Sequence, residues 1–214
     1  TPRKHQAYLH RQIDNHRWNV LVCHRRFGKT VCMINHLIRS ALLSKLNNPR
    51  FAYIAPTFKQ AKSIAWDYMK QFTAKIPHTK FNETELRVDL PNGSRITLLG
   101  SESPDGLRGI YLDGCVIDEY ANVNSKLFPE IIRPALSDRK GYCVFIGTPM
   151  GMNNNFYELY QHAQGAEDWF NYKAKASDTK IVDNDELVKA KEVMGEKKYN
   201  QEFECDWIAN IEGA

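Results

Sequence analysis

The sequence contains no run of about 18 apolar residues, the length that a helix needs to cross a bilayer. No basic stretch followed by an apolar segment opens the chain, so no signal peptide is expected. Internal repeats and low-complexity tracts are absent as well. The sequence therefore argues against membrane-spanning and secreted proteins.

A cysteine pattern typical of disulfides or of a zinc site is also missing. The chain has five cysteines, an odd number, and none of them form a C-x-x-C pair. Most lie inside apolar runs, so we expect buried, reduced thiols rather than disulfides or a zinc site. The five positions are Cys23, Cys32, Cys115, Cys143 and Cys205.

Charge of one sign does not dominate either. The 214 residues include 29 Lys and Arg against 25 Asp and Glu, which gives a formal charge of +4. This mild excess permits an anionic partner such as DNA but does not require one. With 43% hydrophobic residues, the chain is long enough for one globular domain and a small appended subdomain.

Short apolar segments and helical patterns alternate along the chain. Strands are predicted at 20–23, 51–55, 115–117, 142–146 and 170–176, with helices near 31–42 and 57–75. Pro91-Asn92-Gly93 predicts a hairpin turn between strands at 86–90 and 95–99. Fully apolar strands separated by helices predict an α/β fold with a mostly parallel sheet covered on both faces. Charged helices at 185–194 and 197–205 predict a separate helical subdomain, so we divide the chain into 1–177 and 178–214.

The segment from Cys23 to Thr30, called the lysine loop below, follows a strand and opens a helix. It fits the phosphate-binding pattern G-x4-G-K-[ST], except that Cys23 replaces the first glycine. Amides at a helix N-terminus attract anions, Lys29 would neutralise phosphates and Thr30 would bind Mg²⁺. The alternative is an ordinary strand–turn–helix with these residues by chance. Arg25 and Arg26 suggest extra charge on a γ-phosphate.

A buried strand ends in the acidic pair Asp118-Glu119. Asp118 would bind Mg²⁺, and Glu119 would polarise a water for attack on the γ-phosphate. Alone, the pair is as typical of a helix N-cap. Together with the lysine loop, it predicts a P-loop NTPase of the RecA/ASCE-like class that uses ATP and Mg²⁺.

Five ordered motifs resemble the N-terminal ATPase domain of the large terminase subunit of tailed bacteriophages. The resemblance covers nearly the whole chain, and the combination is more specific than any single motif. The motifs are Pro2-Arg3-Lys4-His5-Gln6, the loop from Arg25 to Thr30, the segment from Tyr53 to Ala61, Gly106-Leu107-Arg108-Gly109, and Gly147-Thr148-Pro149.

The resemblance implies a role for each position. Gln6 would bind adenine, although a residue that caps a helix or faces solvent is the alternative. Arg25 would sense the γ-phosphate, Arg108 would reach a neighbouring subunit or else form a salt bridge, and Thr148 would couple hydrolysis to movement or else lie in a plain turn. The implied catalytic residues are Glu119, Arg25, Arg108 and Lys29; the nucleotide-binding residues are Gln6, Arg25, Arg26, Phe27, Gly28, Lys29, Thr30, Asp118 and Thr148; the metal ligands are Thr30 and Asp118.

The resemblance further implies a motor that packages double-stranded DNA from the host cytoplasm. Its partners would be a portal protein on a procapsid, a small terminase subunit and other copies in a pentameric ring. The family carries a C-terminal nuclease domain, and Ile211–Ala214 fall about where the linker of residues 178–214 would pass to that domain, so no nuclease activity is expected here. The competing interpretations are a RecA-like helicase or translocase fragment, a nucleotide-binding switch, and a structural nucleic-acid-binding module.

Overall fold

The structure is a computed structural model that describes residues 1–208. The predicted junction between the linker and a nuclease domain, at Ile211–Ala214, lies outside the described residues. The chain divides into two compact units: the first comprises Thr1–Lys29, Glu119–Ala121 and the chain from Phe145 onward, and the second comprises Thr30–Asp118 and Asn122–Val144. The chain thus passes from one unit to the other within the lysine loop and again within the acidic pair.

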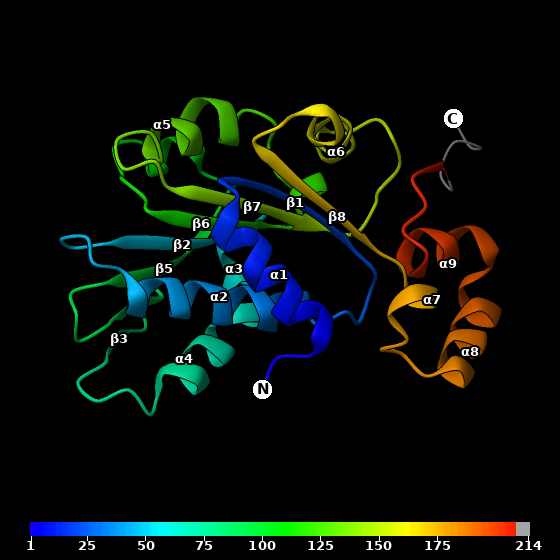
Figure 1. Ribbon diagram of the computed structural model, residues 1–214, viewed down its shortest axis with the longest axis horizontal. Helices are drawn as coiled ribbons and strands as arrows, with labels where there is room; N and C mark the ends of the chain where they lie inside the picture. The colour runs from blue at the N-terminus through cyan, green and yellow to red at the C-terminus, as the bar shows by residue number, and fades with distance from the viewer. Residues whose placement is uncertain (209–214) are drawn as a thin grey trace. The chain divides into compact units, whose positions relative to one another are not determined.

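Eight strands form one sheet in the order β3-β4-β5-β2-β6-β7-β1-β8 (Figure 1). Strand β2 runs parallel to β5 and β6, β1 runs parallel to β8, and β3, β4 and β5 are antiparallel neighbours. The predicted α/β fold is confirmed. The strands are β1 (Trp18–Cys23), β2 (Arg50–Ala55), β3 (Lys80–Asn82), β4 (Arg87–Asp89), β5 (Arg95–Gly100), β6 (Gly114–Asp118), β7 (Tyr142–Gly147) and β8 (Trp169–Ala174).

In the first unit, helices α1 (Lys4–Asn15) and α6 (Asn155–Gly165) lie on opposite sides of β1 and β8 (Figure 1). The alternation of β8 explains this arrangement, because successive strand residues point to opposite faces. Phe170 and Tyr172 pack their rings against Tyr8 of α1. Trp169 and Asn171 contact α6, where the Asn171 amide donates to the Ala163 carbonyl at 3.2 Å.

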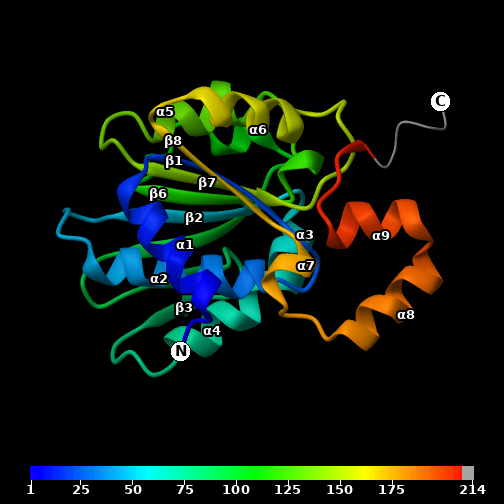
Figure 2. The same ribbon diagram turned by 45° about the vertical axis from the view of Figure 1, so that its right-hand side comes forward.

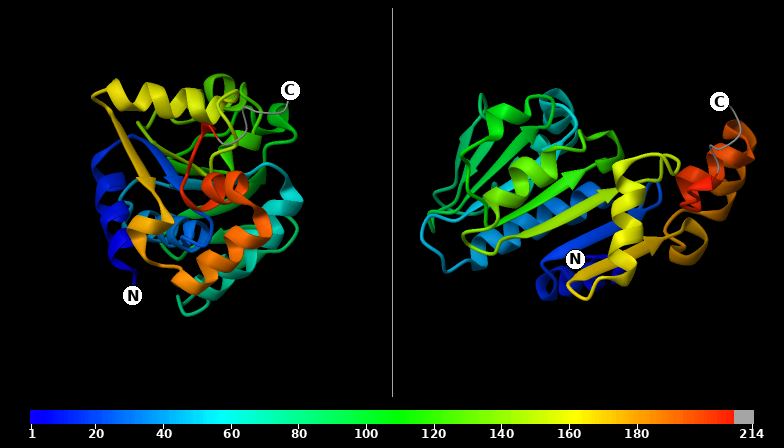
Figure 3. Two further views of the ribbon diagram at one scale, coloured as in Figure 1. Left: turned by 90° about the vertical axis from the view of Figure 1, so that its right-hand side faces the viewer. Right: turned by 90° about the horizontal axis from the view of Figure 1, so that it is seen from above.

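Three helices follow β8 in the first unit: α7 (Ala176–Thr179), α8 (Asn184–Met194) and α9 (Glu196–Phe203) (Figures 2 and 3). Ala176, Leu187 and Phe203 form a hydrophobic cluster between them, onto which Tyr199 and other half-buried side chains pack. The two predicted charged helices are confirmed. The predicted strand was too long at its end, because β8 stops at Ala174 and α7 already begins at Ala176.

In the second unit, α2 (Lys29–Leu43) packs an apolar face that includes Met33, Ile34 and Leu37, all fully buried. The predicted helix from 57 to 75 is confirmed as α3 (Phe58–Ala61), the π-helical segment η1 (Lys62–Trp66) and α4 (Asp67–Thr73). Further short elements are the 3-10 helices η2 (Pro104–Leu107) and η3 (Tyr120–Asn122), the π-helical segment η4 (Phe128–Ile132) and the short helix α5 (Arg133–Ala135). The boundary between the two units falls inside η3, after Ala121.

The expected burial of the five cysteines is confirmed, and the structure joins none of them in a disulfide. The sulfur atoms of Cys115 on β6 and Cys143 on β7 lie 3.5 Å apart. No helix within residues 1–208 is long and apolar enough to cross a membrane.

Candidate active site

The loop between β1 and α2 contains two residues with a left-handed backbone. Arg26 and Gly28 adopt left-handed φ angles of 69° and 90°. A Cβ atom at Gly28 would lie 3.1 Å from the Gln6 amide nitrogen, so both the backbone and the space favour glycine here. Cys23 is still extended strand, paired with Ala174 of β8, which is why this position tolerates a side chain in place of the motif's first glycine.

The Lys29 ammonium group is held within the first unit. It lies 3.1 Å from the Thr148 hydroxyl oxygen and 3.4 Å from the carbonyl oxygens of Cys23 and His24. The Thr148 hydroxyl itself donates to the Cys23 carbonyl at 3.2 Å. Thr148, which the family resemblance connected to hydrolysis, is therefore brought next to the lysine of the loop.

Gln6 connects the first helix to the same loop. Its side-chain oxygen accepts a hydrogen bond from the Arg3 amide at 3.0 Å, so it does cap α1. Its side-chain nitrogen donates to the Gly28 carbonyl over 3.4 Å. The capping alternative is realised, and it leaves Gln6 beside the loop.

The two loop arginines differ from their neighbour Phe27 in exposure. Arg25 and Arg26 are both exposed, and the Arg25 guanidinium lies 3.9 Å from a Glu202 carboxylate oxygen on α9. Phe27 is fully buried, with its ring against His24. Any contact of Phe27 with a nucleotide would therefore fall to its backbone.

The first residue of the acidic pair, Asp118, has a buried carboxylate. Asp118 ends β6 with 4% of its surface exposed, and the fully buried Tyr53 on β2 donates its hydroxyl proton to the carboxylate. Burial of a carboxylate is costly unless it is hydrogen-bonded or meets a cation. In the same unit Thr30 contributes a hydroxyl, so the two predicted ligands are hard oxygen donors of the kind that Mg²⁺ prefers.

The backbone at Glu119 is left-handed. Its φ angle is 48°, a conformation that is uncommon outside glycine and that seven other non-glycine residues of the described chain also adopt. The next element is the single turn Tyr120–Asn122 rather than an α-helix, so the pair does not begin an α-helix as its N-cap.

Within residues 1–208, no three His, Cys, Asp or Glu side chains cluster as a metal site. Mg²⁺ does not need such a cluster, because it commonly takes one or two protein ligands and completes its shell with water and phosphate.

Arg108 lies in the second unit, in the loop after η2. Its guanidinium is 3.8 Å from a Glu130 carboxylate oxygen, and 57% of the side chain is exposed. The salt bridge that the sequence left open as an alternative is present. Exposed ion pairs of this kind contribute little energy to stability.

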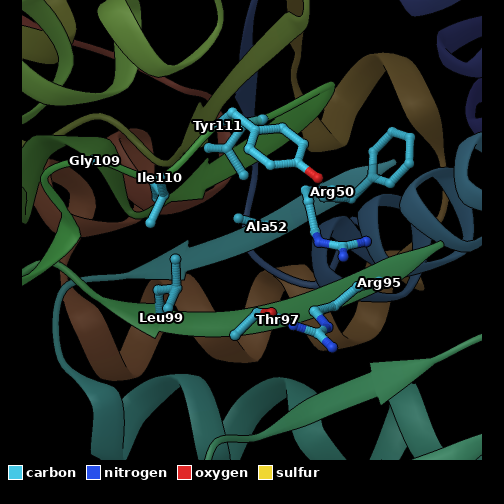
Figure 4. Close-up of a pocket in the computed structure, with 10 residues that line it drawn as sticks. Arg50, Ala52, Arg95, Thr97, Leu99, Gly109, Ile110 and Tyr111 are labelled. Atoms are coloured by element: carbon cyan, nitrogen blue, oxygen red, sulfur yellow. The ribbon is translucent and has the colours of Figure 1, made fainter. Parts of the chain in front are cut away.

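A cavity of about 300 Å³ lies on the face of β2 and β5 in the second unit (Figure 4). Arg50 and Arg95, which line it, are the first residues of their strands. Both guanidinium groups have partners, Arg50 at the Gly93 carbonyl and Arg95 at Asp89. Ligands of parallel sheets bind beyond the carboxyl ends of the strands, so this cavity is not the predicted nucleotide site.

Two residues that contact the site had no role predicted from the sequence. Tyr53 was recognised only as part of a motif, and His24 only as a loop residue. A buried tyrosine has to place its hydroxyl proton and a buried histidine its ring nitrogens, so both needed partners. Sequence alone could not tell that the partners are Asp118 and Thr179.

Comparisons with known proteins bear on this site. Residues 22–214 match the family model described as terminase large subunit, T4likevirus-type, N-terminal. The terminase large subunits of Thermus phage G20c and Thermus virus P23-45 are each 30% identical over 126 residues. These matches cover 50% of this chain and only 26% of either relative.

Solved structures share the fold. The large terminase ATPase domain of Thermus phage P74-26 has a TM-score of 0.81 at 22% identity, with 97% of this chain and 94% of that chain covered. The large terminase of another thermophilic bacteriophage, in complex with ADP, has a TM-score of 0.82 at 16% identity, with 96% and 53% covered. The family match extends over most of the sequence, and the chain belongs to the terminase large subunit family, of which it represents the N-terminal region.

Proposed function

We propose that this chain is the ATPase motor domain of a phage terminase large subunit, which hydrolyses ATP to translocate double-stranded DNA into a procapsid. The observation that carries the proposal is the joint presence of the lysine loop and the acidic pair, with Asp118 buried, in a chain of this family. The names of its structural relatives agree: one is a large terminase ATPase domain, and another was solved with ADP and with ATP-gamma-S.

The loop residues would bind the triphosphate. Amides at the N-terminus of α2 point toward an anion, and the helix dipole adds to their attraction. Lys29 would exchange its contacts with the loop carbonyls for the β- and γ-phosphates, while Thr148 stays bonded to Cys23. Gln6, next to Gly28, would bind the adenine edge.

Hydrolysis would depend on Glu119. Its carboxylate would accept a proton from the attacking water as the water oxygen bonds to the γ-phosphorus and the bond from that phosphorus to the β-phosphate oxygen breaks, so that ADP and phosphate leave. Arg25 would stabilise the charge on the γ-phosphate. Thr30 and Asp118 would hold Mg²⁺, which would supply positive charge to offset that of the phosphates.

Tyr53 would keep Asp118 oriented as a metal ligand. Changing Tyr53 to Phe removes only the hydroxyl that donates to the carboxylate. We expect the Mg²⁺ concentration for half-maximal ATP binding to rise about tenfold, the usual scale for a lost partner of a metal ligand. Binding is measured by equilibrium titration at a series of Mg²⁺ concentrations.

Tyr142 provides the matched control for Tyr53. Its hydroxyl also donates a hydrogen bond, to the Ser40 hydroxyl oxygen at 3.1 Å. Tyr142 lies on β7 and Ser40 on α2, so this bond does not involve Asp118. Tyr142→Phe should leave the Mg²⁺ dependence unchanged. If Tyr53→Phe behaves like Tyr142→Phe, Tyr53 does not orient the metal ligand.

As a packaging motor, the protein would act in the host cytoplasm with a portal protein, a small terminase subunit and other copies of itself in a pentameric ring. Thr148 would transmit hydrolysis to the parts that grip DNA. The grip would act on phosphates, so translocation would be independent of DNA sequence and weakened by salt.

Arg108 would complete the ATP site of a neighbouring subunit. A protein with Arg108→Ala keeps its own ATP site, and a protein with Lys29→Ala keeps its own Arg108. Neither alone should hydrolyse ATP well, but mixed rings contain sites with an intact lysine and an intact arginine from the neighbour. We expect phosphate release from the mixture to exceed the sum of the two separate proteins.

The mixing experiment requires conditions in which rings form, verified by sedimentation. Mixing Arg108→Ala with itself at the same total concentration is the control for concentration effects. A mixture that shows only the sum of the two activities would mean that Arg108 does not act in trans.

The proposal as a whole is tested by phosphate release from Mg²⁺·ATP, together with ATP binding. A motor domain should release many phosphates per chain. A chain that binds ATP but releases less than one phosphate would be a nucleotide-binding switch. A chain that neither binds nor hydrolyses ATP would be a structural module, and either result would overturn the proposal.

A further inference from the structure

His24 lies inside the lysine loop, yet its side chain is buried and not exposed to solvent. It is fully buried, whereas the next two residues, Arg25 and Arg26, are exposed. Its ring packs edge-on against Phe27 with 5.6 Å between centroids. A buried imidazole must satisfy both ring nitrogens, and both have partners.

The partners fix the tautomer of His24. Nδ1 lies 2.6 Å from the Arg25 carbonyl oxygen, which can only accept, so Nδ1 carries the proton. Burial lowers the pKa of His24; the Arg25 carbonyl opposes this, while the positive charge of Lys29 adds to it. The neutral ring is therefore favoured, and in it Nε2, which lies 2.8 Å from the Thr179 hydroxyl oxygen, accepts the hydroxyl proton.

Thr179 belongs to the C-terminal helices. It is the last residue of α7, and Lys180 then turns the chain toward α8 through a left-handed φ of 52°. The hydrophobic cluster of Ala176, Leu187 and Phe203 joins α7, α8 and α9, so a displacement of one helix affects the others. A hydrogen bond to Thr179 is therefore a bond to this helical group.

Two further contacts attach the start of the loop to the same region. The His24 amide donates to the Ala174 carbonyl at the end of β8, at 3.0 Å. The Arg25 amide donates to the Glu202 carbonyl of α9 at 2.8 Å. The other end of the loop is held differently, through Lys29 and Thr148.

We propose that His24 is a positioning residue whose hydrogen bond to Thr179 makes the shape of the lysine loop depend on the position of α7, α8 and α9. Movement of these helices would then alter nucleotide affinity, and nucleotide binding would in turn restrain the helices. The two effects are reciprocal because they express one coupling free energy. The inference rests on the proposed binding of ATP at this loop.

The test compares Thr179→Val with Thr179→Ser. Valine keeps the shape of threonine but leaves Nε2 of His24 without a donor, whereas serine retains the hydroxyl. For Thr179→Val we expect the Kd of ATPγS to rise about three- to tenfold, the scale of one buried hydrogen bond. Thr179→Ser should bind as the unchanged chain does. His24→Asn, which keeps only the donor toward the Arg25 carbonyl, should resemble Thr179→Val.

Hydrogen exchange provides a readout that needs no hydrolysis. In the unchanged chain, ATPγS should slow amide exchange in residues 175–205, and Thr179→Val should reduce this slowing by at least half. A variant that melts earlier but keeps both the affinity and the nucleotide-dependent protection would overturn the inference, since His24 would then only stabilise the fold. If ATPγS fails to bind even the unchanged chain, the proposed function fails instead.

Discussion

Replacing Glu119 with glutamine or alanine is expected to lower ATP turnover at least about 100-fold, the scale of a lost general base. Glutamine is the sharper change, because it keeps the size of the side chain but cannot accept the water's proton. The binding of ATP should stay within about twofold, since Glu119 contacts the attacking water rather than the phosphates. Phosphate release and equilibrium ATP binding are measured on the same preparations.

Glu167 offers a matched control for Glu119. It is an exposed glutamate in the turn after α6 and has no role in the proposed site. Glu167→Gln should release phosphate at the unchanged rate. If Glu119→Gln also does so, the carboxylate that activates water has to be another one.

Replacing Lys29 with alanine should weaken ATP binding and abolish turnover. An ammonium that bonds two phosphate groups contributes charge-assisted hydrogen bonds worth about 1.5–3 kcal/mol each, so we expect ATP affinity to fall at least about tenfold. Turnover should fall to background, because the same charge stabilises the reacting γ-phosphate. Isothermal titration with ATPγS and a phosphate-release assay measure the two effects.

The fold should survive the loss of Lys29. Its ammonium bonds loop carbonyls and Thr148, but Thr148 keeps its own bond to the Cys23 carbonyl. The melting temperature should therefore change by only a few degrees, on the scale of about 1 kcal/mol. Lys45→Ala, an exposed position just after α2, is the control for loss of a positive charge. Unchanged ATP affinity in Lys29→Ala would exclude the loop as the phosphate site.

The two changes separate binding from chemistry. Lys29→Ala should lose affinity, whereas Glu119→Gln should bind ATP and hold it unhydrolysed. Glu119→Gln is for this reason the variant of choice for trapping an ATP complex. A chain in which both variants bind equally well and hydrolyse equally slowly would not follow the proposed division of roles.

The parallel strands were predictable because they are apolar on both faces. Every residue of β1 and β6 is buried, so these segments appear as continuous hydrophobic runs. Short or polar elements gave no such signal. Strand β3 has three residues, of which Lys80 and Phe81 are exposed, and it was missed.

Helix α1 was missed for a related reason. Only Gln6, Leu9 and Ile13 are buried along its length, so its apolar stripe is narrow and one of its members is polar. The sequence did identify Gln6 as a candidate, through the family resemblance. That it both caps α1 and reaches Gly28 depends on a contact between segments 22 residues apart.

The candidate site was predictable where its residues are close in sequence. Lys29 and Thr30, or Asp118 and Glu119, are recognisable because a strand precedes each pair. The contacts of His24 with Thr179 and of Tyr53 with Asp118 join residues 155 and 65 positions apart. Periodicity carries no information on such pairs, and only the assembled fold reveals them.

The central claim is that ATP binds and reacts at the loop and the acidic pair, and a crystal structure with Mg²⁺ and ATPγS tests it most directly. The account predicts the triphosphate on the amides of the loop, with Lys29 on the β- and γ-phosphates and Mg²⁺ on Thr30 and Asp118. It also predicts a water between Glu119 and the γ-phosphate. A nucleotide bound elsewhere, such as the cavity beside Arg50 and Arg95, or a loop site in which Asp118 and Glu119 face away from the phosphates, would contradict it.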